Sequence, residues 1–396
     1  MPLRPVSMVI AGAGLAGLVA ARAAAGRAGR ITLVDPRTDP RSGGDASESR
    51  AELLGPRSLA VIDAFGLGEA VRTAGILISG ERRHSTDGGS TDDLYPRGRM
   101  VAIDRERLRG ILVAALAEQP TVDLRFERAV VSVDPLAGKI AVARAGSITD
   151  GVIEVSADLL IGADGADSLI RDALLRSGGS VSRDELPAAW YALPLRTPSA
   201  THALAGDRLH RWTASGAAIV ALPYGSGLLS GILVVRAGVI PTDVDPALWL
   251  TRTFPSAVAH IAVSPATVMA APARPVIETR VGRLVGGVTA LIGDAAGTAA
   301  PFGATGAAMA IASATALVAA MDTDGEPADC LAAYEAAIRP EYAAAATLGA
   351  FATDRLIAGG RPDPLARLRP ARRLPIEAIH FAGPTFAAAS GELFIR

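Results

Sequence analysis

The chain of 396 residues contains one cysteine, Cys330, and one lysine. A single cysteine excludes an internal disulfide and a metal site built on clustered cysteines, so we expect no metal and a reducing, cytoplasmic setting. The formal net charge is −1 and no long run of like charges occurs. The sequence therefore offers no electrostatic case for nucleic acid or an anionic membrane surface as partner. A small molecule is the expected partner, and the oligomeric state stays open.

Long uninterrupted apolar runs are also missing. The N-terminal stretch VSMVIAGAGLAGLVAARAAA has the composition of a signal peptide, but three glycines interrupt it and the strand-like run ITLVD follows. This pattern favours a folded strand–helix–strand unit over a leader sequence. No other segment approaches the ~20 apolar residues of a membrane span. We expect no membrane span.

Half of the residues are hydrophobic, which is enough for a large core and two or three structural units. Periodicity predicts α/β character at the N-terminus, an antiparallel sheet over 187–240, and a return of α/β character at 275–320, which is typical of a discontinuous domain. The predicted strands are 6–11, 30–34, several between 122 and 162, and a pair within 275–292; the predicted helices are 15–25, 55–74, 104–118, 243–263, 306–321 and 327–357.

The first motif is the run GAGLAG, which follows a predicted strand and opens a helix. Gly12 permits a tight turn, Gly14 lets the backbone approach a pyrophosphate, and Gly17 allows close helix packing. Asp35 ends the next strand and can accept a hydrogen bond from a ribose hydroxyl. This motif predicts dinucleotide binding and does not distinguish NAD from FAD.

Two further motifs lie far downstream. In DLLIGADGADSLIR (158–171) a buried strand leads into the turn Asp164-Gly165 and a short helix, a corner that is also common without any ligand. In GDAAGTAAPFGATG (293–306) one acidic residue, Asp294, stands among small residues that let a backbone approach a flat ligand. The helix that follows points its positive end at this loop.

These three motifs, in this order, resemble the flavoprotein monooxygenases of the p-hydroxybenzoate hydroxylase type, and kynurenine 3-monooxygenases are the most similar group in arrangement and length. The resemblance covers most of the chain. It implies FAD as cofactor, NAD(P)H as co-substrate, and hydroxylation by O2 of a small metabolite, expected to be aromatic, through a flavin C4a-hydroperoxide.

The same resemblance implies an α/β fold in which a mostly antiparallel β-sheet substrate domain is inserted into a discontinuous Rossmann-like FAD-binding domain, with helices at the C-terminus. The expected ranges are 1–75, 99–180 and 275–322 for the FAD-binding domain, 76–98 and 181–274 for the substrate domain, and 323–396 for the C-terminal helical region.

Site residues are implied by the resemblance, position by position. Asp294 would bind a ribityl hydroxyl, the Asp164 turn would also contribute to nicotinamide binding, and Pro301 and Phe302 would lie beside the reacting edge of the flavin. Trp190, Trp212 and Tyr224 would line the substrate pocket or, equally, form ordinary core of the sheet. The implied cofactor-binding residues are Gly12, Gly14, Leu15, Ala16, Gly17, Asp35, Arg37, Arg50, Arg105, Val130, Asp164, Gly293, Asp294, Gly306, Ala307 and Ala308.

Departures from the family pattern keep other functions open. Gly297 stands where the family has histidine, and Ala312-Ser313 replaces a common acidic pair. The form GDAAG also resembles isoprenoid (geranylgeranyl-type) reductases, and the missing polar residues leave a flavin-binding protein without turnover as a third reading. For kynurenine itself, Ser79 and Arg99 stand where the resemblance implies a carboxylate-binding arginine and tyrosine, so neither identity is kept, although Arg82 and Arg83 are close enough to substitute. Kynurenine is therefore one option among aromatic or polycyclic substrates.

Overall fold

The computed structural model describes residues 6–42, 50–85, 88–95, 100–196, 204–225, 227–301, 305–322 and 325–357. Phe302 and the chain beyond 357 lie outside the described residues, and so does most of the C-terminal region expected at 323–396. Within the described residues, helices that combine the length and the apolar character needed to cross a bilayer are absent.

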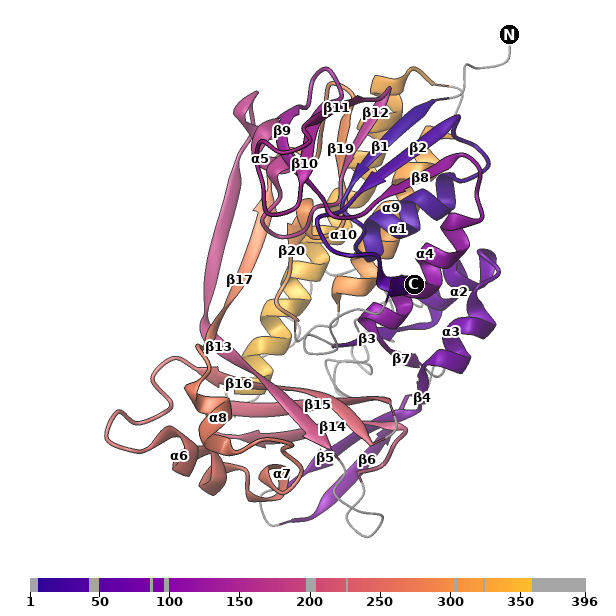
Figure 1. The fold of residues 1–396 in the computed structure, drawn as a ribbon. Coiled ribbons are helices and arrows are strands. Elements are labelled where there is room, and N and C mark those ends of the chain that lie inside the picture. The colour runs from indigo at the N-terminus through magenta and orange to yellow at the C-terminus, as the bar shows by residue number, and fades with distance from the viewer. Residues whose placement is uncertain are drawn as a thin grey trace, which may run out of the picture.

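A parallel sheet forms the core of the larger unit (Figure 1). Its strands pair in parallel, except that the edge strand β18 runs antiparallel to β19. Strands of such a sheet are covered on both faces and therefore read as continuous hydrophobic runs, as β1 and β2 do. The strand order is β18 (Val285–Gly286), β19 (Thr289–Leu291), β12 (Leu159–Gly162), β1 (Ser7–Ala11), β2 (Arg30–Val34) and β8 (Val122–Arg125).

Helices rich in alanine and glycine cover one face of this sheet, and their small side chains allow α1 and α9 to pack closely. The other face carries α5 (Leu169–Arg176) and a small antiparallel sheet (Figure 1). The covering helices are α1 (Leu15–Ala24), α4 (Arg105–Ala117), α9 (Thr305–Met321) and α10 (Pro327–Ile357); the small sheet is β11 (Ile153–Ser156), β10 (Lys139–Arg144) and β9 (Arg128–Asp134).

The second unit is an eight-stranded sheet, antiparallel except for the parallel pair β14–β5. Three short helices, α6 (Pro246–Thr253), α7 (Pro255–Val258) and α8 (Pro265–Ala270), bury one of its faces. The strand order is β20 (Gly297–Thr298), β17 (Arg274–Val281), β13 (Val181–Arg196), β16 (Leu228–Arg236), β15 (Ala217–Gly225), β14 (Arg208–Ala214), β5 (Gly80–His84) and β6 (Ser90–Leu94).

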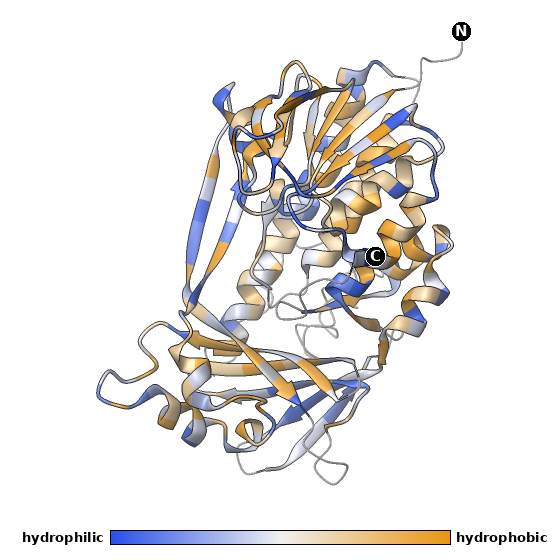
Figure 2. Cartoon of the chain, in the orientation of Figure 1, coloured by the Kyte–Doolittle hydropathy of each residue, from blue (hydrophilic) through white to orange (hydrophobic). Residues whose placement is uncertain are grey.

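Two long strands connect the units. β13 and β17 pair with each other and run from the second sheet toward the parallel sheet (Figure 1). In Figure 2 the parallel sheet is largely hydrophobic, whereas β13 and β17 carry hydrophilic stretches where they cross between the units. A further small sheet lies where the units meet, with the order β3 (Ala51–Leu54), β7 (Met100–Asp104) and β4 (Ile76–Ile78).

Three sequence expectations differ from the structure. The helix expected over 243–263 is two helices, α6 and α7, because Pro255 begins the second one. The helix expected over 55–74 is two helices, α2 (Pro56–Ala64) and α3 (Gly68–Ala74), because Gly66 adopts a φ of 77° and ends the first one. The strand pair expected at 275–292 is divided between sheets, because β17 pairs with β13 while β18 and β19 join the parallel sheet. The chain therefore returns to the parallel sheet at β18 and not at β17, which begins near residue 275. The domain ranges themselves stay a prediction.

Candidate active site

The three sequence motifs meet at one edge of the parallel sheet. Ala11, Gly162 and Leu291 stand in register at the carboxyl ends of β1, β12 and β19. The amide of Ala163 donates to the carbonyl of Ala11 (2.8 Å), and the amide of Ile292 donates to that of Gly162 (2.9 Å). Because carboxyl ends of parallel strands share an edge, residues 280 positions apart in the chain become neighbours there, at the place where open α/β sheets bind ligands.

The three glycines of GAGLAG differ in what an added Cβ would meet. Gly12 has a φ of +108°, and a Cβ added to it would lie 2.2 Å from the carbonyl oxygen of Ala163. A Cβ at Gly17 would lie 1.9 Å from the carbonyl oxygen of Gly12, so helix packing requires glycine. At Gly14 an added Cβ would meet nothing within 4 Å. Among the described residues no protein atom explains the glycine at position 14, and the open space there is compatible with the close approach of a dinucleotide.

A cavity of about 170 Å³ opens beside these motifs, and we refer to it as the first cavity. It joins the GAGLAG turn to the Gly293 turn and to the start of α9. Its lining residues are Gly14, Leu15, Ala16, Arg37, Glu52, Arg105, Leu108, Arg109, Ala163, Gly165, Gly293, Asp294, Gly306, Ala307 and Ala310.

Asp35 lies behind the first cavity and holds the GAGLAG turn. It is fully buried, and its carboxylate accepts from the amide of Ala13 (2.6 Å) and from the amide and guanidinium of Arg37 (2.8–2.9 Å). Burial alone would raise the pKa of Asp35, but these hydrogen bonds and the charge of Arg37 outweigh it and hold the pKa below the usual value. A ribose contact by Asp35 stays a prediction.

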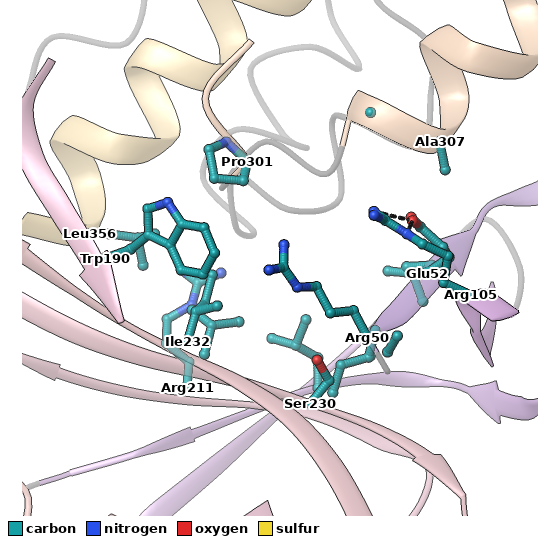
Figure 3. A pocket seen from close by; sticks show the side chains of 16 residues that line it. Arg50, Glu52, Arg105, Trp190, Arg211, Ser230, Ile232, Pro301, Ala307 and Leu356 are labelled. Carbon is teal, nitrogen blue, oxygen red and sulfur yellow. Dashed lines mark hydrogen bonds and ion pairs between the residues drawn. The ribbon is translucent and has the colours of Figure 1, made fainter. Parts of the chain in front are cut away.

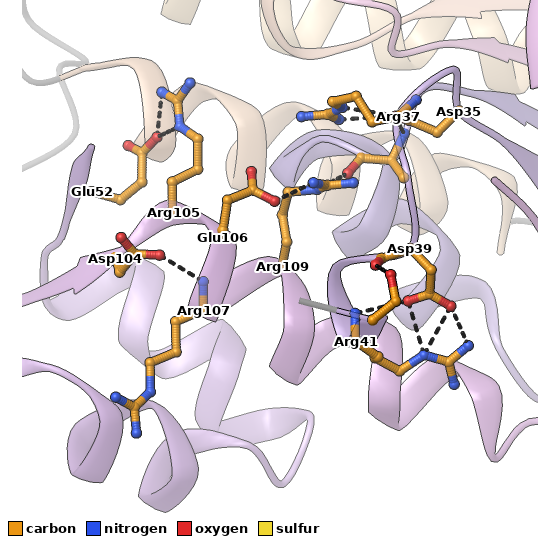
Figure 4. A network of polar contacts seen from close by, with 12 residues as sticks. Asp35, Arg37, Asp39, Arg41, Glu52, Asp104, Arg105, Glu106, Arg107 and Arg109 are labelled. Carbon is orange, nitrogen blue, oxygen red and sulfur yellow. Dashed lines mark hydrogen bonds and ion pairs between the residues drawn. The ribbon is translucent and has the colours of Figure 1, made fainter. Parts of the chain in front are cut away.

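Arg109 was missed by the sequence reasoning. It is 3% exposed, its Nε donates to the carbonyl of Ala13 (2.9 Å), and it forms an ion pair with Glu106 (Figure 4). Among the described residues its Nη2 has no hydrogen-bond partner. Arg105 stands one helical turn earlier on the same face of α4, so the i, i+4 spacing was an available signal. With Arg37 these arginines make the first cavity suitable for an anionic ligand.

Asp294 follows the carboxyl end of β19 and faces the first cavity. Gly293 has a φ of 59° and opens the turn that carries Asp294. The side chain of Asp294 is exposed where it faces the cavity, and protein atoms surround its carboxyl on the other sides, so that the group is partly enclosed. This burial raises the pKa of its carboxyl, while the charge of Arg105 opposes the rise and that of Glu52 adds to it.

Asp164 serves a structural role in the described geometry. Its carboxylate accepts from the hydroxyl of Ser168 (2.5 Å) and the amide of Ile170 (3.2 Å), which closes the corner before α5. Its neighbours Ala163 and Gly165 line the first cavity instead. Burial raises the pKa of Asp164, and these hydrogen bonds oppose the rise. Its expected contact with the cofactor stays a prediction.

A second cavity, of about 270 Å³, lies between the two units (Figure 3). Strands β14, β15 and β16 form one wall, and the segment around Arg50 and the start of α9 form the other. Glu52, Arg105, Gly306 and Ala307 line both cavities, so the two are adjacent. The other lining residues are Arg50, Ala51, Leu53, Trp190, Leu209, Arg211, Val220, Leu222, Ser230, Ile232, Pro301 and Leu356.

Charged and aromatic side chains face each other across the second cavity. The Arg50 guanidinium carbon lies 5.2 Å from the centroid of the Trp190 ring, and Arg274 lies 5.0 Å from it. Arg105 forms an ion pair with Glu52 (2.5 Å). Arg211 forms one with Glu81 (3.0 Å), a residue almost fully buried behind the cavity wall.

Other expected site residues lie elsewhere. Trp212 is 2% exposed and stacks on His84, 4.2 Å between ring centroids, on the face of the sheet that α6–α8 cover, so it is core and does not line the cavity. Tyr224 lines neither cavity. Val130 packs against the core of the parallel sheet, and Ala308 faces a groove beside α2.

The arginines considered for a substrate carboxylate are also displaced. Arg82 and Arg83 form ion pairs with Asp92 and Asp93 across the β5–β6 hairpin, both at 2.6 Å, and they do not line the second cavity. Arg211 holds that position instead. Alternation along β5 and β14 puts Arg82 in register with His210, on the face opposite Arg211. Arg83 is in register with Arg211 but is paired with Asp93 of the hairpin.

Comparisons with known proteins show the family and the fold of this chain. A sequence profile of the FAD-binding domain matches residues 5–347. The chain is 30% identical to a kynurenine 3-monooxygenase of Salinispora arenicola (strain CNS-205), over 96% of this chain and 88% of that protein. It is 29% identical to a kynurenine 3-monooxygenase of Xanthomonas euvesicatoria pv. vesicatoria (strain 85-10), over 87% of this chain and 78% of that protein.

Solved structures with the same fold include 2-methyl-3-hydroxypyridine-5-carboxylic acid oxygenase, with a TM-score of 0.74, 21% identity, and coverage of 95% of this chain and 99% of that chain. PqsL of Pseudomonas aeruginosa, described as a probable FAD-dependent monooxygenase, gives a TM-score of 0.70 and 21% identity over 89% of this chain and 97% of that chain.

Proposed function

This chain belongs to the FAD-binding domain family, and on that premise we propose where its cofactor and substrate bind and which class of substrate it takes. It is a flavoprotein monooxygenase that uses FAD, NAD(P)H and O2, as its similarity to kynurenine 3-monooxygenases indicates. The same comparisons do not favour the isoprenoid reductase or the flavin-binding protein without turnover. A cytoplasmic location is part of the proposal and rests on the single cysteine.

The cofactor lies, in this proposal, along the first cavity with its ring system at the boundary of the second. Gly14 and the N-terminus of α1 bind the pyrophosphate, with Arg37 and Arg109 providing positive charge. Asp294 accepts from a ribityl hydroxyl, and Gly306 and Ala307 let the ring approach the start of α9. FAD reduced by NAD(P)H supplies the activation of dioxygen.

One observation carries this placement. Glu52, Arg105, Gly306 and Ala307 line both cavities, so a ligand that fills the first cavity reaches the second with its end. The start of α9 then directs its partial positive charge at that end and stabilises negative charge there. Pro301 lies on the second-cavity side of the same boundary, beside the substrate.

The substrate is a small aromatic acid. Trp190, Leu222 and Ile232 provide an apolar wall for a ring. Among the described lining residues, three are arginines and one is a glutamate, so the cavity favours an anion. Arg211 is held in place by buried Glu81 and can bind a carboxylate with two parallel hydrogen bonds. The volume of about 270 Å³ suits one or two rings, and kynurenine is one candidate.

A substrate screen tests the proposal. NADPH oxidation and oxygen uptake are measured with kynurenine, single-ring aromatic acids, their methyl esters and amides, and polycyclic phenols. We expect aromatic acids to stimulate both rates together, and esters, amides and polycyclic phenols to be poor substrates. Equal stimulation by acids and by their methyl esters would contradict the assignment of an anionic substrate. Reduction of a substrate double bond without oxygen would contradict hydroxylation.

A further inference from the structure

The turn that carries Asp294 is held from two helices outside the sheet. The amide of Gly293 donates to Oγ of Ser313 in α9 (3.0 Å), and the hydroxyl of Tyr342 in α10 donates to the carbonyl of Gly293 (2.8 Å). The amide N–H and the carbonyl of Gly293 are thus both bound by side chains. The last sheet hydrogen bond before the turn is the one from Ile292 to Gly162 (2.9 Å), so the sheet itself does not hold Gly293.

Ser313 is built to accept this bond. It is fully buried, and its hydroxyl proton is already donated to the carbonyl of Met309 (2.7 Å). The oxygen therefore remains an acceptor for Gly293. Ser313 stands in the pair Ala312-Ser313, where the family resemblance leads one to expect acidic residues. In this chain a neutral hydroxyl binds the turn, and it adds no second negative charge near Asp294.

Tyr342 reaches the turn from the other side. It is partly exposed, toward a third cavity of about 340 Å³ that Asp294 and Gly297 also line. A Cβ added to Gly297 would lie 3.3 Å from the Tyr342 ring. The glycine that replaces the expected histidine therefore leaves room for this ring beside the turn.

A second tyrosine of α10, Tyr334, makes the same type of hydrogen bond as Tyr342 but at a different place. Tyr334 lies two helical turns earlier, is fully buried, and donates its hydroxyl to the carbonyl of Leu291 (2.6 Å). Leu291 belongs to β19 and is already held by pairing with β12. Both tyrosines thus make the same type of bond from the same helix, but only that of Tyr342 reaches the turn.

We propose that Tyr342 and Ser313 are positioning residues that fix the Gly293–Asp294 turn for binding of the flavin, and that α10 is thereby part of the cofactor site. The inference rests on the flavin placement proposed above. A peptide with a positive φ and no sheet partner samples other conformations unless its polar groups are bound. When Tyr342 and Ser313 already fix the Gly293–Asp294 turn, cofactor binding does not have to order it. The affinity for the flavin is therefore higher.

The test compares Tyr342→Phe with its matched control Tyr334→Phe in the full chain. Each change removes one hydroxyl that donates to a backbone carbonyl, so both variants should lose thermal stability, and Tyr334→Phe, at the fully buried position, should lose at least as much. After removal of bound flavin, FAD is titrated and its Kd is obtained from the quenching of flavin fluorescence. We expect Tyr342→Phe to raise the Kd roughly fivefold and to shift the visible spectrum of bound flavin, and Tyr334→Phe to change neither.

Ser313→Ala is the second variant and should also raise the FAD Kd, since it leaves the buried Gly293 amide without its acceptor. The inference is overturned if Tyr342→Phe and Ser313→Ala bind FAD as the unmodified chain does, or if Tyr334→Phe weakens FAD equally, because loosening of α10 would then explain the effect. An unmodified chain that fails to bind FAD would instead refute the proposed function, so the two failures are distinguishable.

Discussion

Arg50 and Trp190 face each other across the second cavity, with 5.2 Å between the guanidinium carbon and the centroid of the indole ring. Arg50 precedes β3 and accepts at its carbonyl from the amide of Arg105 (2.9 Å), while Trp190 belongs to β13 of the other unit. The contact therefore joins the two units at the proposed substrate position, and it keeps the indole ring oriented toward the cavity.

Trp190→Leu should weaken substrate binding and leave cofactor binding intact. The change removes an aromatic wall and a cation–π contact, worth about 1–2 kcal/mol together, so we expect kcat/KM for an aromatic acid to fall about 5- to 30-fold. Steady-state kinetics with FAD titration as a second readout checks this. Trp249→Leu, on α6 and away from the cavity, is the control and should keep kcat/KM. A loss of the same size in the control would remove Trp190 from the substrate site.

Arg211 should decide the preference for acids. Arg211→Gln should reduce kcat/KM for an aromatic acid by about 10- to 100-fold, since a charge-assisted hydrogen bond contributes roughly 1.5–3 kcal/mol. Alone, this variant leaves Glu81 buried without its cation and should be destabilised. The double variant Arg211→Gln/Glu81→Gln should regain stability and keep the kinetic defect. If the double variant regains full activity on acids, Arg211 does not bind the substrate.

Asp294→Ala should lower flavin occupancy sharply, with the fold retained, because the side chain lies in a turn facing the first cavity. The flavin occupancy of Asp294→Asn should lie between those of Asp294→Ala and the unmodified chain, since an amide oxygen still accepts from a hydroxyl. The ratio of visible to ultraviolet absorbance reports occupancy, and far-ultraviolet circular dichroism reports the fold. The control is Asp167→Ala, whose side chain is 96% exposed. An unchanged yellow colour in Asp294→Ala would contradict the flavin placement.

A histidine pair should make stability depend on pH. His84 Nε2 and His210 Nδ1 lie 2.9 Å apart; burial, followed for His84 by the charge of His210, lowers the pKa of each from 6.5 to about 4. Arg82 and His260 add to the lowering, and Asp92 opposes it.

Below pH 6.5 both histidines bind protons in the unfolded chain but stay neutral in the folded chain. Their contribution to the free energy of unfolding is therefore complete above pH 6.5 and declines toward pH 4. The slope is up to about 1.4 kcal/mol per pH unit for each proton. Urea unfolding at pH 7, 5.5 and 4.5 measures it, and His84→Gln should reduce the decline. An equally steep decline in that variant would assign the effect to other groups.

Strand pairing explains why much of the cofactor region was predictable. GAGLAG, Asp164 and Gly293-Asp294 each follow a buried hydrophobic run, and parallel strands bring their carboxyl ends to one edge. The helix predicted over 104–118 is likewise found, as α4, and Asp104 caps it by accepting from the amide of Arg107 (2.9 Å). Such features depend on neighbours close in sequence or on a repeated pattern.

The second cavity was less predictable. Trp190 and Trp212 both lie in strand-like runs of the middle region, and nothing local separates cavity wall from core. The difference arises because α6–α8 cover the face that carries Trp212, whereas the opposite face meets the other unit. Arg211, and not the expected Arg82, lines the second cavity for the same reason, since a strand side chain faces whichever layer its register gives it.

The sequence by itself predicted a dinucleotide cofactor, and it determined that three distant segments each follow a buried strand and that one acidic residue, Asp294, stands in the last of them. These properties follow from the tight turns and close backbone approaches that the chain makes after a buried strand. Small residues directly after a hydrophobic run indicate such places in the sequence. Only the tertiary structure decided which arginine faces the second cavity and which tyrosine bonds to Gly293. Those outcomes depend on how separate layers pack, and packing is a property of surfaces assembled from residues far apart in the chain.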